Sequence, residues 1–366
     1  MSGTAPPASD RAHGSELPRF LSGLYALLIV YASLEPFSGW MEPIPGTSFF
    51  LWGNFASATT RADIAINMTA YFPFGFFLAS IGSHARPSVR VVRALCVAAA
   101  LSIALESAQM YLPTRDASGL DVLTNVGGAL LGAFAALAFT GSSRLRRKAS
   151  RWRHGIFIAG KSGDFGLALL GIWVLAQLNP AIGLFAATFD PPHELAPDLV
   201  STLLEAAQSA FHVIGVGLFL ALLLRQRRFI GGAVLLLLGA TLMLKGFAAT
   251  LLLRPAAWDT WLRPGVSLGV ALGVLSLLLA IWLPRPIQMA TCAVALLSSL
   301  VAPRLASDLW QARPPLAHFD WSYGQLLNFN GLTHAVLIVW PVFASFYLLW
   351  LAGQPAWGHR GWNESV

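Results

Sequence analysis

The sequence has few charged residues and almost no cysteine. Only 11% of its 366 residues are Asp, Glu, Lys or Arg, whereas a soluble domain carries about a quarter, so a soluble globular fold is excluded. The two cysteines, Cys96 and Cys292, lie far apart in the sequence, which excludes a disulfide framework and a Cys-x-x-Cys metal site. The chain also lacks a His-Glu-x-x-His motif, the usual sign of a zinc protease.

The residues that are abundant indicate a membrane protein. Hydrophobic residues make up 56% of the chain, its mean hydropathy is +0.63, and apolar runs of about 20 residues recur. The net charge of +7 does not indicate nucleic acid, because the basic residues lie in short loops between apolar runs. We expect an all-α polytopic membrane protein with about ten transmembrane helices. The expected spans are 19–35, 63–81, 92–112, 121–140, 160–178, 199–224, 229–253, 266–283, 287–302 and 332–352.

The distribution of basic residues predicts the topology. A cytoplasmic N-terminus places most Lys and Arg residues inside, including the run at 144–153, as the positive-inside rule requires. Both termini are then cytoplasmic. We expect residues 1–16 to be a disordered cytoplasmic tail, since they are polar and have no apolar core. Residues 144–156 form a basic cytoplasmic linker between a four-helix membrane domain, 17–143, and a six-helix membrane domain, 157–366.

Polar residues gather at the ends of three neighbouring spans. Asp63 and Asn67 are four residues apart at the start of the second span, and Glu106 and Gln109 end the third. In this topology they share the outer leaflet with Arg115 and the start of the fourth span. A charge inside a membrane costs about 2.5–3.5 kcal/mol, so such residues usually serve a function. An Asp at a helix start is often only a cap, but Glu106 is too deep in its span to be one.

The fourth span combines polar groups with small residues. Asp121, Asn125, Gly128 and Gly132 follow each other at helical spacing, so the carboxylate and the amide sit above a Gly-x-x-x-Gly stripe that packs against protein. In the second span, Pro73 and Gly75 predict a break that frees a backbone carbonyl for the same region.

These residues resemble the VanZ-like family. The shared pattern is an Asp and Asn opening one helix, Pro-Phe-Gly, Glu-x-x-Gln, an Arg, then Asp-x-x-x-Asn and a Gly-rich helix. It covers roughly residues 20–140 of this sequence. The resemblance implies a bacterial inner-membrane protein of the cell envelope, in a family whose founding member is associated with glycopeptide antibiotic resistance. It implies no particular reaction.

The second half contains a similar segment. Ser201 to Gln208 matches Ser102 to Gln109 in Ser, Leu, Glu, Ala and Gln at equivalent positions. Glu205 and Lys245 lie at similar depths in neighbouring spans, so we expect them to form a buried structural pair, because an unpaired buried lysine is costly.

Three hypotheses follow for the polar cluster. In the first, Asp63, Asn67, Glu106, Gln109, Arg115, Asp121 and Asn125 bind the head of an amphiphilic envelope molecule, such as a lipid-linked precursor or a lipophilic glycopeptide, for binding or transport. In the second, Glu106 and Asp121 act as general acid and base, or hold a divalent cation, in a membrane enzyme. In the third, the cluster only holds helices together. We favour the first, with membrane lipids as partners and no nucleic acid. No metal site is predicted, and cofactors stay open.

Overall fold

The computed structural model describes residues 15–43, 46, 49–51, 61–185, 199–255, 258–259, 261–301, 319 and 323–354. Within these residues the protein is α-helical, and the only β-type pairing is in two isolated bridges. Residues 1–14 of the predicted disordered tail lie outside the described residues.

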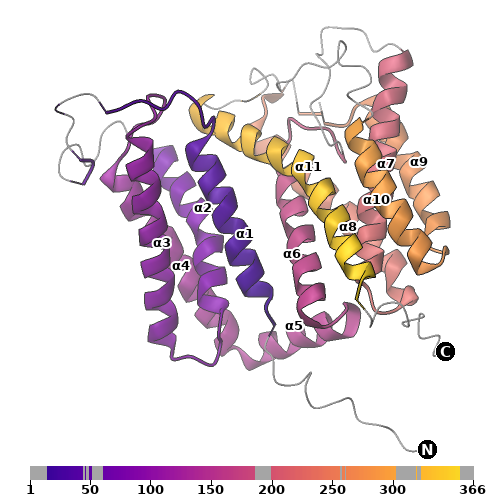
Figure 1. The fold of residues 1–366 in the computed structure, drawn as a ribbon, viewed down its shortest axis with the longest axis horizontal. Helices are drawn as coiled ribbons and strands as arrows, with labels where there is room; N and C mark the ends of the chain where they lie inside the picture. The colour runs from indigo at the N-terminus through magenta and orange to yellow at the C-terminus, as the bar shows by residue number, and fades with distance from the viewer. Residues whose placement is uncertain are drawn as a thin grey trace, which may run out of the picture. The chain divides into compact units, whose positions relative to one another are not determined.

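The chain forms two compact units. The first unit comprises residues 1–154 and 159–168, and the second comprises residues 155–158 and 169–366. Helices of the first unit are α1 (Leu17–Leu34), α2 (Arg61–Ser80), α3 (Pro87–Gln109), α4 (Gly119–Gly141), α5 (Ser143–Ile156) except its last two residues, and the first half of α6 (Gly160–Ala176) (Figure 1). The second unit continues with the rest of α6, α7 (Leu199–Leu223), the short 3-10 helix η2 (Arg227–Phe229), α8 (Ile230–Leu252), α9 (Pro264–Ala280), α10 (Arg285–Val301) and α11 (Tyr323–Ala352).

Length and composition identify six candidate membrane spans among the described residues: α1, α3, α4, α7, η2 with α8, and residues 328–352 of α11. The apolar helices α9 and α10 are shorter, and the opening turns of α2 carry Asp63 and Asn67, which lower its hydropathy. The protein is therefore a multi-pass membrane protein, and the predicted number of ten spans is not confirmed.

The first unit is built around close packing of α2 on α4. A Cβ added at Gly132 would lie 2.0 Å from the carbonyl oxygen of Phe72, and one at Gly128 would lie 2.2 Å from that of Met68. Only glycine allows two backbones to approach so closely. Gly75 on α2 makes the reciprocal approach, 2.0 Å from the carbonyl oxygen of Ala129. Small residues of both helices thus let α2 and α4 hold their polar ends together.

Helix α2 is continuous through Pro73. The sequence predicts a break at this proline, but the chain stays helical from Arg61 to Ser80. Neighbouring helices compensate for the lost hydrogen bond when a proline lies inside a packed membrane helix. The carbonyls of Met68 and Phe72, before the proline, and Gly75, after it, lie against the backbone of α4, so tight packing supports the helix on both sides of the proline.

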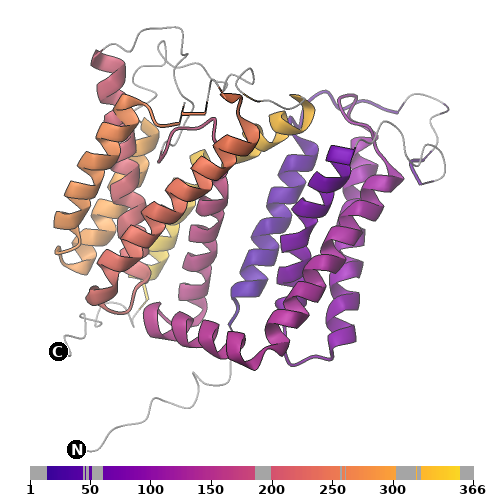
Figure 2. The same cartoon turned by 180° about the vertical axis from the view of Figure 1, so that it is seen from behind.

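The basic segment after α4, which the sequence analysis describes as a linker, forms a helix. It begins at Ser143, two residues after α4 ends, and continues to Ile156. Figures 1 and 2 show α5 running crosswise to α3 and α4, at the end of the first unit where α4 ends. At the same end, Arg90 Nε donates to the carbonyl of Ala79 (2.6 Å) and Arg93 Nη2 to that of Leu78 (2.8 Å). This end of the first unit is therefore rich in cations.

The second unit is organised around α7, which packs mainly on α9 and α10. A Cβ at Gly269 of α9 would lie 2.3 Å from the carbonyl oxygen of Ala206, so these helices also meet backbone to backbone. Deeper in the unit, Trp173 Nε1 donates to His212 Nε2 (2.8 Å) and stacks on its ring. Both side chains are fully buried, which makes His212 a packed, hydrogen-bonded core residue.

Candidate functional site

The site lies at the end of the first unit where α3 ends and α4 begins. The start of α2, the end of α3 and the start of α4 meet there: hydrogen bonds join α3 to α4, and α2 packs closely on α4. We call Asp63, Asn67, Tyr71, Ser102, Glu106, Ser118, Asp121 and Asn125 the acceptor cluster, because carboxylate, amide and hydroxyl oxygens dominate it.

Glu106 connects the end of α3 to the start of α4. Its Oε2 accepts a hydrogen bond from the backbone N–H of Ser118 (2.8 Å), and the residue is 5% exposed. Ser118 is also the N-cap of α4, since its Oγ accepts from the N–H of Leu120 (3.2 Å). Among the described residues no Lys or Arg side chain forms a salt bridge with Glu106. In the part of the chain that the structure describes, this carboxyl group is thus buried with a single backbone donor and no counter-ion.

Asn125 and Tyr71 extend the cluster along α4 and α2, toward the middle of these helices. Asn125 Nδ2 donates to Ser102 Oγ (3.0 Å), and the Tyr71 hydroxyl contacts Ser102 and lies near the Glu106 carboxylate. The Oδ1 atom of Asn125 is buried and has no hydrogen-bond partner in the described part of the chain. An acceptor is therefore left open in the middle of the cluster.

Asp121 faces the start of α2. Its carboxylate interacts with Asp63 and with the Asn67 side chain, and it lies within electrostatic range of Glu106. The Oδ1 atom of Asp121 is buried and, across the described residues, lacks a hydrogen-bond partner. Two aspartates and one glutamate therefore lie close together, an arrangement that like charges disfavour unless something neutralises them.

Gln109 and Arg115 belong to a different group of contacts. Gln109 Nε2 donates to the carbonyl of Ser33 (3.0 Å), and Arg115 Nη2 donates to those of Glu35 (2.7 Å) and Ala32 (3.4 Å). These are carbonyls at the C-terminus of α1, where helices leave acceptors without intrahelical partners. Burial lowers the pKa of Arg115, while the nearby Glu35 carboxylate raises it. Both residues thus cap α1.

Sequence reasoning missed Ser118 and did not treat Tyr71 as part of the site. Tyr71 had a detectable signal, since it follows Asp63 and Asn67 at the same four-residue spacing. Ser118 had none in the spacing pattern, because its contribution to Glu106 is a backbone N–H.

In the second unit the two predicted structural charges have other partners. Arg263 Nη2 lies 2.9 Å from Glu205 Oε1, and Lys245 Nζ donates to the carbonyl of Asn179 (2.8 Å). Glu205 is thus paired with Arg263 and not with Lys245. Depth along neighbouring helices did not identify the partner, because Arg263 immediately precedes α9 and reaches Glu205 across the tight α7–α9 contact.

Two short motifs outside the acceptor cluster match enzyme patterns without their structural context. Residues 155–162 read Gly-x-x-x-x-Gly-Lys-Ser, the pattern of a phosphate-binding loop. Such a loop connects a strand to a helix, whereas here the segment before α6 is the end of helix α5, and the described residues between them form no strand. Residues 265–269 read Gly-x-Ser-x-Gly but lie inside α9, not at a strand-to-helix turn. No group of three or more His, Cys, Asp or Glu in the described chain is arranged to hold a metal ion.

One comparison with known proteins matches the N-terminal part of the chain to a family model. Residues 11–140 match the VanZ/LLP1 family model, so the resemblance inferred from sequence is confirmed for the N-terminal part of the chain. Neither the curated proteins nor the solved structures give a match.

Proposed function

We propose that this membrane protein, with its N-terminal VanZ/LLP1 domain, binds an amphiphilic molecule of the bacterial cell envelope through the acceptor cluster, for capture or transport. One observation supports this most directly: Asp121 Oδ1 and Asn125 Oδ1 are buried acceptors without partners among the described residues. A ligand that donates hydrogen bonds would satisfy both atoms.

Energetics favour a ligand over an unoccupied cluster. Each buried polar atom left without a partner costs about 1–3 kcal/mol, and the proximity of Asp63 to Asp121 adds repulsion if both are ionised. A purely structural cluster would be more stable with amides in place of these carboxylates. The cost is consistent with a site that keeps acceptors ready for a substrate.

The oxygen-rich composition of the acceptor cluster indicates which kind of ligand head group it binds. Carboxylates and amide oxygens accept hydrogen bonds, so they favour ammonium and hydroxyl groups. Arg115 and Gln109, the donors that would suit a phosphate, are engaged with the C-terminus of α1. We therefore place the sugar or amine part of a lipid-linked precursor, or the amino groups of a lipophilic glycopeptide, in the cluster.

The membrane side follows from the charges of the first unit. Arg90, Arg93 and the basic helix α5 lie at the opposite end from the acceptor cluster. By the positive-inside rule this opposite end is cytoplasmic. The acceptor cluster then lies in the outer leaflet of the inner membrane, where completed envelope precursors and external glycopeptides are found, and the start of α1 lies on the cytoplasmic side.

Isosteric substitutions test the proposal. Glu106→Gln and Asp121→Asn keep shape but remove charge, so affinity for a fluorescent lipoglycopeptide or a polyprenyl-linked disaccharide should fall at least about tenfold, or ~1.4 kcal/mol. Thermal unfolding of the purified variants should stay close to that of the parent protein. Asp116→Asn is the matched control, because Asp116 is exposed in the loop before α4. Parent-like affinity in both cluster variants, or no binding of either probe by the parent, would refute the proposal.

A membrane enzyme is the second candidate, favoured by the electrostatic interaction between Glu106 and Asp121. Two neighbouring carboxyl groups can share a proton and act as acid and base. Product formation from the same lipid-linked probe by the purified parent protein, lost in Glu106→Gln, would place the protein in this class.

A further inference from the structure

Helix α5 carries an apolar stripe beside a dense set of basic residues. Leu145, Ala149, Trp152 and Ile156 follow each other at spacings of four, three and four, which places them on one face of a helix. Leu145 is 51% exposed and Trp152 is 60% exposed. The remaining faces carry Arg144, Arg146, Arg147, Lys148, Arg151, Arg153 and His154. The helix contains no acidic residue.

The orientation of α5 within the first unit suits a membrane surface. Because α4 is a candidate span and α5 begins two residues after it ends, α5 starts where the chain leaves the membrane. It then runs crosswise to α3 and α4 (Figures 1 and 2). A helix that runs crosswise to the spans beside it lies along the membrane surface.

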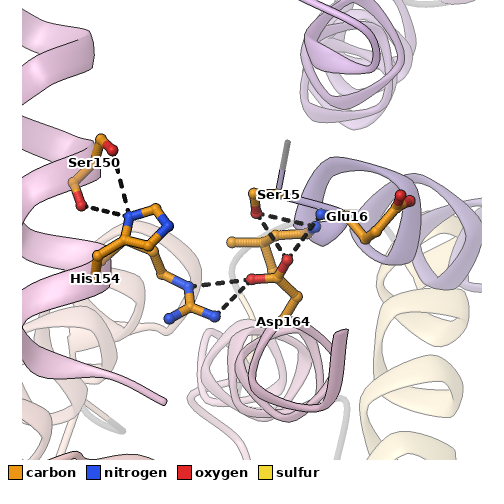
Figure 3. A network of polar contacts seen from close by, with 7 residues as sticks. Ser15, Glu16, Ser150, His154 and Asp164 are labelled. Carbon is orange, nitrogen blue, oxygen red and sulfur yellow. Dashed lines mark hydrogen bonds and ion pairs between the residues drawn. The ribbon is translucent and has the colours of Figure 1, made fainter. Parts of the chain in front are cut away.

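The end of α5 is fixed by a charged contact that sequence reasoning did not identify. Arg153 Nε and Nη2 donate to Asp164 Oδ1 on α6 (3.1 and 2.7 Å), and the Asp164 side chain is 5% exposed. The other oxygen, Oδ2, accepts from Ser15 Oγ (2.9 Å) and from the backbone N–H of Glu16 (2.8 Å) before α1 (Figure 3). His154 meanwhile turns back to Ser150 on α5 itself. Asp164 therefore anchors the end of α5 to the starts of α1 and α6.

We propose that α5 lies in the head-group layer of the cytoplasmic leaflet and binds anionic phospholipid. The stripe of Leu145, Ala149, Trp152 and Ile156 inserts at the boundary of the acyl chains, and the flanking Arg and Lys side chains contact phosphate groups, as in other interfacial amphipathic helices. Lipid is favoured over a protein partner because Leu145, Ala149 and Trp152 of the stripe are exposed, and because the helix follows a membrane span directly and carries charge of one sign.

The first test measures where the stripe lies. The full-length protein carries Cys96→Ala, because Cys96 is exposed while Cys292 is buried, and a fluorescent label at Ala149→Cys on the stripe. Ser150→Cys, on the polar side of the same turn, is the matched control. In nanodiscs with about a third phosphatidylglycerol, the label at 149 should be shielded from aqueous iodide and quenched by head-group-proximal doxyl lipid, while the label at 150 stays accessible to iodide. Equal iodide access at both positions would overturn the proposal.

The second test measures lipid preference and separates the alternatives. Replacement of Arg144, Arg147, Lys148 and Arg151 by Gln should lower the preference of the protein for spin-labelled phosphatidylglycerol over phosphatidylcholine by about twofold or more, without loss of thermal stability. An unchanged preference would refute anionic lipid as the partner. Shielding at 149 that persists in lipid-free detergent and rises with protein concentration would instead assign the stripe to a second copy of the chain.

Discussion

Glu106 in the first unit and Glu205 in the second lie in similar sequence segments and have different surroundings. Both follow a serine by four residues and precede a glutamine by three, and both are buried near a helix end. Glu205 has a guanidinium partner, Arg263, at 2.9 Å. Glu106 accepts one backbone N–H and has a tyrosine hydroxyl and an aspartate nearby.

The difference separates a structural carboxylate from a candidate functional one. A buried ion pair neutralises its own charges and holds two elements together. A carboxyl group without a counter-ion in the described chain, next to open acceptors, is costly unless a ligand neutralises it. The same local sequence can therefore serve either role, and the residues that decide it lie elsewhere in the chain.

Removal of Arg263 should have the largest effect on stability. Arg263→Met leaves Glu205 buried without the guanidinium, so we expect a loss of about 3–5 kcal/mol in the free energy of unfolding, measured by denaturation in mixed micelles. The double variant Glu205→Gln with Arg263→Met should regain most of that loss, because neither charge remains. A double variant as unstable as the single one would show that Glu205 and Arg263 are not energetically coupled.

Separation of α2 from α4 should have the next largest effect and should also impair binding. Gly132→Ala places a methyl group where only 2.0 Å is available to the carbonyl oxygen of Phe72, which should cost about 1–3 kcal/mol and move Asp63 away from Asp121. Gly127→Ala is the matched control, because the nearest atom to its Cβ is the terminal methyl of Met68 at 3.9 Å. Thermal unfolding and probe titration of the two variants should differ, and equal stability would argue against the close α2–α4 packing.

Arg115→Lys should have a modest effect on stability and none on affinity. Lysine can still donate to the carbonyl of Glu35, but it lacks the planar guanidinium that contacts the carbonyls of both Ala32 and Glu35. We therefore expect the free energy of unfolding to fall by about 1 kcal/mol. A tenfold loss of probe affinity at normal stability would instead place Arg115 against the ligand, as the sequence-based hypothesis had it.

Glu106→Gln should have the smallest effect on stability, and this sharpens the comparison with Glu205. The amide oxygen of glutamine can still accept from the Ser118 N–H, and a neutral group is easier to bury than a carboxylate, so we expect a change below about 1 kcal/mol. The single variant Glu205→Gln, which leaves the guanidinium of Arg263 without its carboxylate, should lose more stability, and denaturation of both variants in mixed micelles provides the measurement. Equal, large destabilisation by both would assign Glu106 a structural role like that of Glu205.

The helices were the most predictable part of the fold. Each expected span corresponds to a helix, because long apolar runs with polar ends specify helices in a membrane. The continuity of α2 at Pro73 and the helical form of the basic segment were not predicted. The backbone of α4 supports α2 at Pro73. In α5 the helical spacing of Leu145, Ala149 and Trp152 was overlooked because most residues between them are basic.

The candidate site was predictable in its members but not in its contacts. Spacing of four placed Asp63 with Asn67 and Asp121 with Asn125 on shared helix faces. Spacing says nothing about which face meets which neighbour, and it did not predict that the Arg115 guanidinium contacts carbonyls at the C-terminus of α1. Matched depth in neighbouring spans likewise did not identify Arg263 as the partner of Glu205.

By itself, the sequence determined that this is a helical membrane protein with a VanZ-like N-terminal part, since composition, apolar runs and a spaced polar motif are properties of the chain. Only the tertiary structure decided which buried charge is paired, which acceptors stay open and which arginine is engaged. Those outcomes depend on contacts within about 3 Å between residues far apart in sequence, and local patterns carry no information about such contacts.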